Sequence, residues 1–303
     1  GNVLQPFDSA ALRTFLQLAA PLAAGYAAHH LILFIDRALA TTVGAGKAAA
    51  LAYAYHLALV VGQMSGLAVS LVVFPRMAEH IAAGDRASVR ATLASALGFV
   101  WVIGLPATCG LILLRAPLVR VLFARGAFDP AATAAVSAPL LWYAWAALCD
   151  ALCQPFWRVL YALRRPWAVL AINGLQTAIR LALNIVLLPI VGYNALAFSA
   201  LIGLGIQALV LSRVAKQYLG PYLPRGWQRV AGRVLLAAIV MSAAMLAVVA
   251  QPVDRPGGWR FGDLLGDAVT LPRLALGSLI GVLAYGLALW ALGYRKTSRE
   301  LYE

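Results

Sequence analysis

Charged residues are scarce in this 303-residue chain: Asp, Glu, Lys and Arg make up 12% of it, about half the share found in soluble globular proteins. Hydrophobic residues make up 63%, and the mean hydropathy is +0.84. A chain of this composition has too little polar surface to fold as a water-soluble globule. The sequence therefore predicts a membrane protein.

Acidic residues and cysteines are especially few. The chain has 11 acidic against 24 basic residues, a formal net charge of +13. The basic residues are spread between apolar runs, which is typical of membrane topology, so no nucleic-acid partner is expected. Three cysteines cannot form a disulfide framework. Cys149 and Cys153 have no His or further Cys nearby, so we interpret them as packing residues, and no metal site is expected.

Catalytic motifs are also missing. The chain contains no Walker loop, no G-x-S-x-G elbow and no H-E-x-x-H pair. These absences argue against an enzyme, and no bound cofactor is expected. Without an ATP-binding motif, any transport by this chain must run downhill, on an ion gradient or on the membrane potential.

Long apolar runs dominate what is present. A helix needs about 20 predominantly apolar residues to cross a bilayer. Eight runs meet this length, and no connector between them is long enough to form a soluble domain. The sequence predicts an all-α polytopic membrane protein with eight transmembrane helices, at residues 12–43, 48–78, 89–114, 131–157, 166–190, 194–215, 229–251 and 270–293.

The basic residues indicate an orientation. Eight spans place both ends of the chain on one face, and most of the 24 Lys and Arg residues lie in the connectors and ends of that face. By the positive-inside rule both ends of the chain are then cytoplasmic. The chain begins with Gly1 rather than Met and has no signal peptide, so we expect it to be part of a longer protein.

Two connectors on the outer side are distinctive. Residues 117–128 interleave apolar side chains with Arg120 and Arg125. This pattern fits a short amphipathic segment at the outer interface, or the ragged end of the third helix. Residues 251–270 carry three aspartates and are interpreted as an ordinary outer loop.

Charged side chains inside the spans are candidate functional residues, because a charge at membrane depth usually faces a bundle interior or a wet cavity. Asp36, Arg37, Asp150 and Arg180 fall in this class. Asp36 and Arg180 lie about 10 and 15 Å from the outer ends of their helices, counted at 1.5 Å per residue, so they are close enough in depth to pair. A pair between Asp150 and Arg180 would need more tilt.

Uncharged polar residues accompany Arg180. Asn173, Gln176, Thr177 and Asn184 recur with it at spacings of three and four, which is one helix face. The face either forms hydrogen bonds that hold neighbouring helices together or is part of a substrate or ion pathway. The intramembrane histidines His29, His30 and His56 are either hydrogen-bonded packing residues or members of a proton relay.

Several motifs, in this order and spacing, resemble the second half of the MurJ (MviN) family, flippases of lipid-linked peptidoglycan precursors in the multidrug/oligosaccharidyl-lipid/polysaccharide exporter superfamily. The similarity spans nearly the whole chain and extends to residues 233–240 and 284–294 in the last two spans. The motifs are FIDRALA at 34–40, LAYAYHL at 51–57, FPRM at 74–77, LFARGAF at 122–128, FWRVLYA at 156–162 and GYNALA at 192–197.

The resemblance implies that the eight spans are helices seven to fourteen of a fourteen-helix, two-lobed transporter. Residues 1–218 would form the second lobe, and residues 219–303 two extra C-terminal helices with a cytoplasmic tail. The first lobe of the same protein would be missing. The implied activity is alternating-access transport of lipid II across the bacterial cytoplasmic membrane, and the implied partners are membrane lipids and a lipid-linked glycan of the undecaprenyl-pyrophosphate type.

The chain departs from the family pattern in its second span, where Tyr55, His56 and Leu59 replace an Asp-Arg pair and a Glu. His56 offers only a pH-dependent positive charge there. The alternatives are a flippase for another undecaprenyl-linked oligosaccharide, a cation-coupled exporter, or a degenerate paralogue that transports nothing.

Some family members bind a cation at positions that match Asp36 and Asn184. We hypothesise that Arg180 takes the place of that ion as the fixed partner of Asp36, which would make this lobe independent of sodium.

Overall fold

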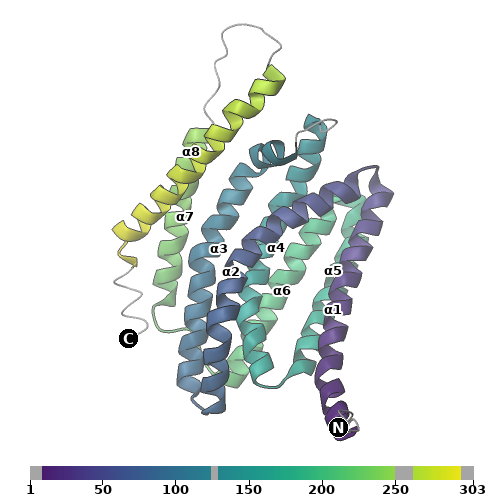
Figure 1. The fold of residues 1–303 in the computed structure, drawn as a ribbon, viewed down its shortest axis with the longest axis vertical. Helices are drawn as coiled ribbons and strands as arrows, with labels where there is room; N and C mark the ends of the chain where they lie inside the picture. Colours follow the sequence, from purple (N-terminus) through teal and green to yellow (C-terminus); the bar gives the residue numbers. More distant parts are fainter. Residues whose placement is uncertain (1–8, 124–128, 250–261, 295–303) are drawn as a thin grey trace, which may run out of the picture.

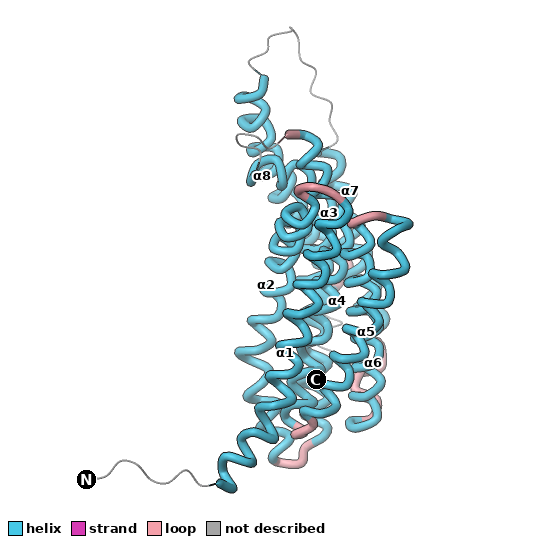
Figure 2. The backbone as a smooth tube through the Cα atoms, turned by 90° about the vertical axis from the view of Figure 1, so that its right-hand side faces the viewer, coloured by secondary structure: helices cyan, strands magenta, loops and turns pink. Residues whose placement is uncertain are grey.

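The structure is a computed structural model that describes residues 9–123, 129–249 and 262–294. All regular structure in these residues is α-helical (Figures 1 and 2). The predicted all-α architecture is therefore confirmed. The helices are α1 (Ser9–Val43), α2 (Lys47–Ala82), α3 (Arg86–Phe123), α4 (Pro130–Ala162), α5 (Pro166–Val191), α6 (Asn194–Leu219), α7 (Trp227–Val249) and α8 (Gly262–Ala291).

Six of these helices, α3 to α8, are long and apolar enough to cross a membrane over the residues that the structure describes fully. The protein is thus a multi-pass membrane protein. Both α1 and α2 contain residues whose side chains lie outside the described part of the chain. The number of eight spans stays a prediction.

Local sequence signals explain where the helices begin and end. Gly46 adopts φ 76° between α1 and α2, a left-handed conformation that glycine reaches without steric strain. Pro166 opens α5, where its missing N–H leaves no hydrogen bond unmade. Asp129 caps α4 by accepting a hydrogen bond from the Ala132 backbone N–H at 2.6 Å. Short turns consequently connect α1 to α2, α2 to α3, α4 to α5 and α5 to α6.

The turns α2–α3, α4–α5 and α6–α7 gather at one end of the bundle, the lower end in Figure 1. We call this the basic end, because arginines and a lysine cluster in and beside these turns. Asp85 caps α3 there, and the hydrogen bonds that it accepts from the Ser88 hydroxyl and backbone hold its pKa below the usual value. The basic residues are Arg86, Arg90, Arg164, Arg165, Arg213, Lys216, Arg225 and Arg229.

Two apolar clusters form the core of α1 to α6. One lies toward the basic end and includes Met77, Phe156 and Leu211. The other lies toward the opposite end and includes Leu51, Leu140 and Leu196. Helix α4 contributes to both clusters and packs against α2, α3 and α6, so it is the central helix of the bundle. Outside this bundle, α7 and α8 pack against each other and against α3 (Figure 1).

The structure decides between the two alternatives for residues 117–123 and changes the predicted start of the last helix. Residues 117–123 are the end of α3, although Pro117 lies within this helix and its last turns bend across the top of the bundle in Figure 1. Residues 124–128 lie outside the described residues. Helix α8 begins at Gly262 rather than at 270, so the prediction of a loop over 251–270 is wrong for its last part, while 250–261 lie outside the described residues.

Close approach of α5 and α6 depends on Gly203. A Cβ atom added there would lie 3.2 Å from Gln176 Nε2 and 3.6 Å from Arg180 Cβ. A Cβ added at Gly205, on the same helix, meets nothing within 4 Å. The two glycines therefore form a matched pair for mutation.

We expect Gly203→Leu to lower the free energy of unfolding by about 1–3 kcal/mol through overpacking between α5 and α6. Gly205→Leu is the control, because it brings the same gain in helix propensity without the clash. Thermal unfolding of the purified protein measures both. Equal unfolding temperatures for the two variants would contradict the packing described here.

Candidate functional site

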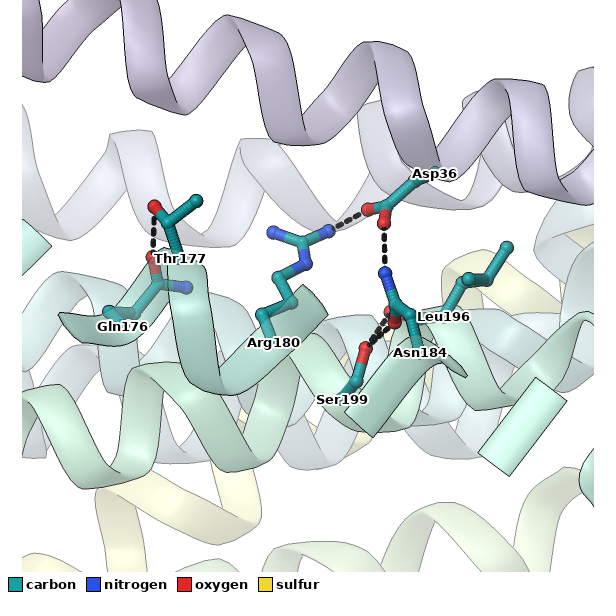
Figure 3. Close-up of polar contacts among 7 residues, drawn as sticks. All are labelled: Asp36, Gln176, Thr177, Arg180, Asn184, Leu196 and Ser199. Atoms are coloured by element: carbon teal, nitrogen blue, oxygen red, sulfur yellow. Dashed lines mark hydrogen bonds and ion pairs between the residues drawn. The ribbon is translucent and has the colours of Figure 1, made fainter. Parts of the chain in front are cut away.

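An ion pair joins α1 to α5 inside the bundle (Figure 3). The Arg180 guanidinium donates a hydrogen bond through Nη2 to Oδ2 of Asp36. Asp36 is 4% exposed and Arg180 is 3% exposed, so both charges are removed from solvent. The predicted pairing of these two residues is confirmed.

The second oxygen of the Asp36 carboxylate is also engaged. Asn184, one turn after Arg180 on α5, donates from Nδ2 to Asp36 Oδ1 at 2.6 Å. The Ser199 hydroxyl on α6 in turn donates to Asn184 Oδ1 (Figure 3). Asn184 and Ser199 are both completely buried. Three helices thus meet in one hydrogen-bonded group, the Asp36 network, formed by Asp36, Arg180, Asn184 and Ser199.

Sequence reasoning missed Ser199. Its only signal was a lone hydroxyl in an apolar stretch, and such residues also bond to the backbone of their own helix. Ser199 does this as well, since its hydroxyl reaches the Leu196 carbonyl oxygen at 3.0 Å. Its hydrogen bond to Asn184 depends on the packing of α6 against α5, which the order of residues in the chain does not reveal.

In this network a guanidinium nitrogen and an amide nitrogen each bond one of the two Asp36 oxygens. The residues that the structure describes also contain no group of three or more His, Cys, Asp or Glu side chains that could hold a metal. A buried carboxylate is costly unless it is paired and hydrogen-bonded, and here protein groups supply both.

The rest of the polar face of α5 divides between two environments. Asn173 accepts a hydrogen bond from Gln207 Nε2 of α6 at 2.8 Å, as expected of a residue that holds two helices together. Gln176 is 8% exposed, and its side-chain oxygen lies 3.4 Å from the Thr177 hydroxyl. These residues therefore share one face of α5, as predicted. All of them except Asn184 also line a cavity.

This cavity has a volume of about 520 Å³ and lies between α2, α4, α5 and α6, with Gly25 of α1 at its wall. Arg180 lies on its wall toward the middle of the bundle, and Arg158 and Tyr161 lie near the end of α4 beside the basic end. Asp150, on α4, lines the stretch between them. Asp150 forms no ion pair in the described part of the chain, and Arg180 pairs with Asp36 instead.

The remaining candidates lie on the outside of the bundle. Arg37, His30 and His56 are exposed, on α1 and α2. The His56 ring makes an edge contact with Tyr55 at 5.9 Å between ring centroids. The side chain of His29 lies outside the described residues. The structure thus does not bring these residues to the Asp36 network, and their predicted roles stay predictions.

A double-mutant cycle tests the energetics of the pair. Asp36→Asn or Arg180→Met alone leaves a buried charge without its partner, which typically costs about 3–5 kcal/mol. The double variant removes both charges, so we expect its loss of stability to be well below the sum of the single losses. Thermal or denaturant unfolding of the three variants measures this coupling, and additive losses would contradict it.

A family model and two curated relatives match most of the chain. The family model described as lipid II flippase MurJ matches residues 3–253. A probable lipid II flippase MurJ of Rhizobium meliloti (strain 1021) is 25% identical over 247 residues, which cover 81% of this chain and 44% of that protein. The corresponding protein of Rhizobium tropici is 26% identical over 286 residues, 93% of this chain and 52% of that protein. The chain spans about half the length of these curated relatives.

Solved structures agree on the fold. A lipid II flippase MurJ in an inward closed conformation superposes with a TM-score of 0.75 at 19% identity, over 97% of this chain and 57% of that one. An outward-facing MATE family transporter of the MOP superfamily gives a TM-score of 0.57 at 15% identity, over 95% and 67%. With the family match over most of its length, the chain belongs to the lipid II flippase MurJ family.

Proposed function

We propose that this chain is the C-terminal part of a transporter that moves lipid-linked peptidoglycan precursor, lipid II, across the bacterial cytoplasmic membrane by alternating access. The family match over residues 3–253 is the observation that carries the proposal. Fold likeness to a lipid II flippase over 97% of the chain supports it. The first lobe of the same protein is the proposed partner of the exposed faces of α1 and α2.

The chain divides into two parts in this proposal. Residues 1–218 are the second transporter lobe, which corresponds to α1–α6 and contains both large apolar clusters. Residues 219–303 add α7 and α8, which attach to α3 through smaller clusters around Leu105 and Leu114. The turn after α6, with Gly220 at φ 77°, separates the two parts.

The basic end is the cytoplasmic end in this proposal, because Lys and Arg are retained preferentially on that side of the membrane. Both ends of the chain then lie in the cytoplasm. The exposed Arg37 and His56, on α1 and α2, are the residues of this lobe that we place on the substrate pathway.

A second candidate is a flippase for another undecaprenyl-linked oligosaccharide. Tyr55, His56 and Leu59 favour it, since they provide no permanent charge where the family pattern has an Asp-Arg pair and a Glu. Cation-coupled export is less favoured, because Arg180 and Asn184 occupy both oxygens of Asp36.

Depletion and rescue test the substrate. We expect the full-length protein to restore growth and lipid II export in bacteria depleted of their own lipid II flippase. We also expect export to be unchanged, within about twofold, when potassium replaces sodium, since a guanidinium fills the position beside Asp36. Failure to restore lipid II export at normal protein abundance would point to another lipid-linked glycan. Export that needs sodium would contradict the fixed-partner role of Arg180.

His56 has its own test. We expect His56→Ala to lower lipid II export by about tenfold, the effect of losing roughly 1.4 kcal/mol of substrate interaction, and His56→Arg to retain it. His80→Ala is the control, because His80 lies near the end of α2 at the basic end. Unchanged export by His56→Ala, at equal protein abundance, would remove His56 from the pathway.

A further inference from the structure

The cavity holds a carboxylate that the Asp36 network does not explain. Asp36 and Asp150 are both aspartates inside helices of the bundle, but their surroundings differ. Both oxygens of Asp36 are bonded to nitrogen donors on α5. Asp150 has no arginine, lysine or histidine within ion-pair distance in the part of the chain that the structure describes. An ionised carboxylate in this position is costly unless something else compensates its charge.

Among the residues that the structure describes, no charged protein group compensates Asp150. Gln154, one turn further along α4, is its side-chain hydrogen-bonding neighbour and is uncharged. Titratable and charged side chains on the cavity wall are Tyr55 of α2, Tyr143, Arg158 and Tyr161 of α4, and Arg180 of α5. Helix α6 contributes only Ala200, Leu204 and Gln207, α1 contributes Gly25, and α3 contributes nothing to this wall.

The cavity extends from near the basic end to the middle of the bundle. Along α5 it runs from Val169, within the first turns after Pro166, to Arg180. That is a length of about 16 Å at 1.5 Å per residue. Its wall toward the basic end carries Arg158 and Tyr161, and its wall toward the middle of the bundle carries Arg180, which is held by Asp36. Polar side chains, among them Gln63, Asn173 and Gln207, line the space between. Such a lining holds water more readily than an apolar one.

We propose that this cavity is a proton-access pathway from the basic end and that the carboxyl group of Asp150 binds the proton. In the uptake step, a hydronium ion in the cavity loses one O–H bond, an O–H bond forms on a carboxylate oxygen of Asp150, and water remains. Release is the reverse step. The proposal concerns proton binding and holds whichever lipid-linked substrate the full protein carries.

A proton fits this position better than a metal ion does. A metal ion needs several ligands, and the described residues contain no cluster of three or more His, Cys, Asp or Glu side chains. Two arginines also share the cavity wall with a single carboxylate. A proton needs only one carboxylate and a path of water, and its binding neutralises the one acidic charge on the wall.

A hydrophobic carbodiimide, which reacts with protonated carboxyl groups in apolar surroundings, provides the test. Purified full-length protein is treated with dicyclohexylcarbodiimide over a range from mildly alkaline to mildly acidic pH, and mass spectrometry locates the label. We expect the label on Asp150 to rise by about tenfold per pH unit while the group is mostly ionised. Asp36 is the internal control and stays unlabelled, because Arg180 and Asn184 engage both of its oxygens inside the bundle; a label on Asp36 reports unfolding.

Three outcomes would overturn the proposal in folded protein, where Asp36 carries no label. Asp150 could stay unlabelled at every pH, or it could be labelled equally at every pH and so bind no proton reversibly. Sodium, but not potassium, could also protect Asp150 from the label, which would make the cavity a sodium site. Asp150→Asn checks the assignment, since it must remove the label from this position alone.

Cysteine labelling tests the direction of access. In full-length protein with Cys109, Cys149 and Cys153 replaced by alanine, Gln63→Cys should react with a membrane-impermeant thiol reagent in inverted vesicles. Thr41→Cys, at the exposed end of α1 away from the basic end, is the matched control and should react in right-side-out vesicles. Reaction of Gln63→Cys only from the side that labels Thr41→Cys would overturn access from the basic end.

Discussion

A buried ion pair between Asp36 and Arg180 sets the geometry of the bundle. Neither charge can turn away from the other without remaining unpaired in an apolar interior, so the pair fixes how α1 is rotated about its axis. The buried face of α1 accordingly carries Ile32, Asp36 and Ala40 at spacings of four. Arg37 then has to point out of the bundle. One contact thus decides which residues of α1 remain available to a substrate or a partner lobe.

Two aspartates inside the bundle, Asp36 and Asp150, have different surroundings. Asp36 has its charge compensated by fixed donors, and Ser199 of α6 holds one of those donors in place. Asp150 lies in a polar cavity without such donors apart from the Gln154 amide. A group that is fully satisfied by its neighbours rigidifies a fold, whereas one that is not remains able to change its charge state. The ion pair therefore has the contacts of a structural element, and Asp150 in the cavity has those of a group that can change its charge state.

Much of this could be read from the sequence. Apolar runs with short connectors predicted the helices, and the similar depth of Asp36 and Arg180 predicted their pairing. The spacing of the α5 residues predicted one polar face. Other features depended on neighbours that the chain order does not reveal: Ser199 became part of the site through the α5–α6 contact at Gly203. The assignment of residues 117–123 to the end of α3 was one of two alternatives that the sequence left open. The start of α8 was misjudged because polar residues were taken as a break, although the helix continues through them.

The sequence by itself determined that this is a membrane protein, and it determined the family to which the chain belongs. Composition and the length of apolar runs depend only on residue type, so they need no coordinates. Tertiary structure alone decided which polar groups are satisfied, because hydrogen bonds between helices join residues far apart in the chain. Asp36 and Asn184 are separated by more than a hundred residues and are bonded at 2.6 Å, while Asp150, in an equally apolar stretch, faces a cavity.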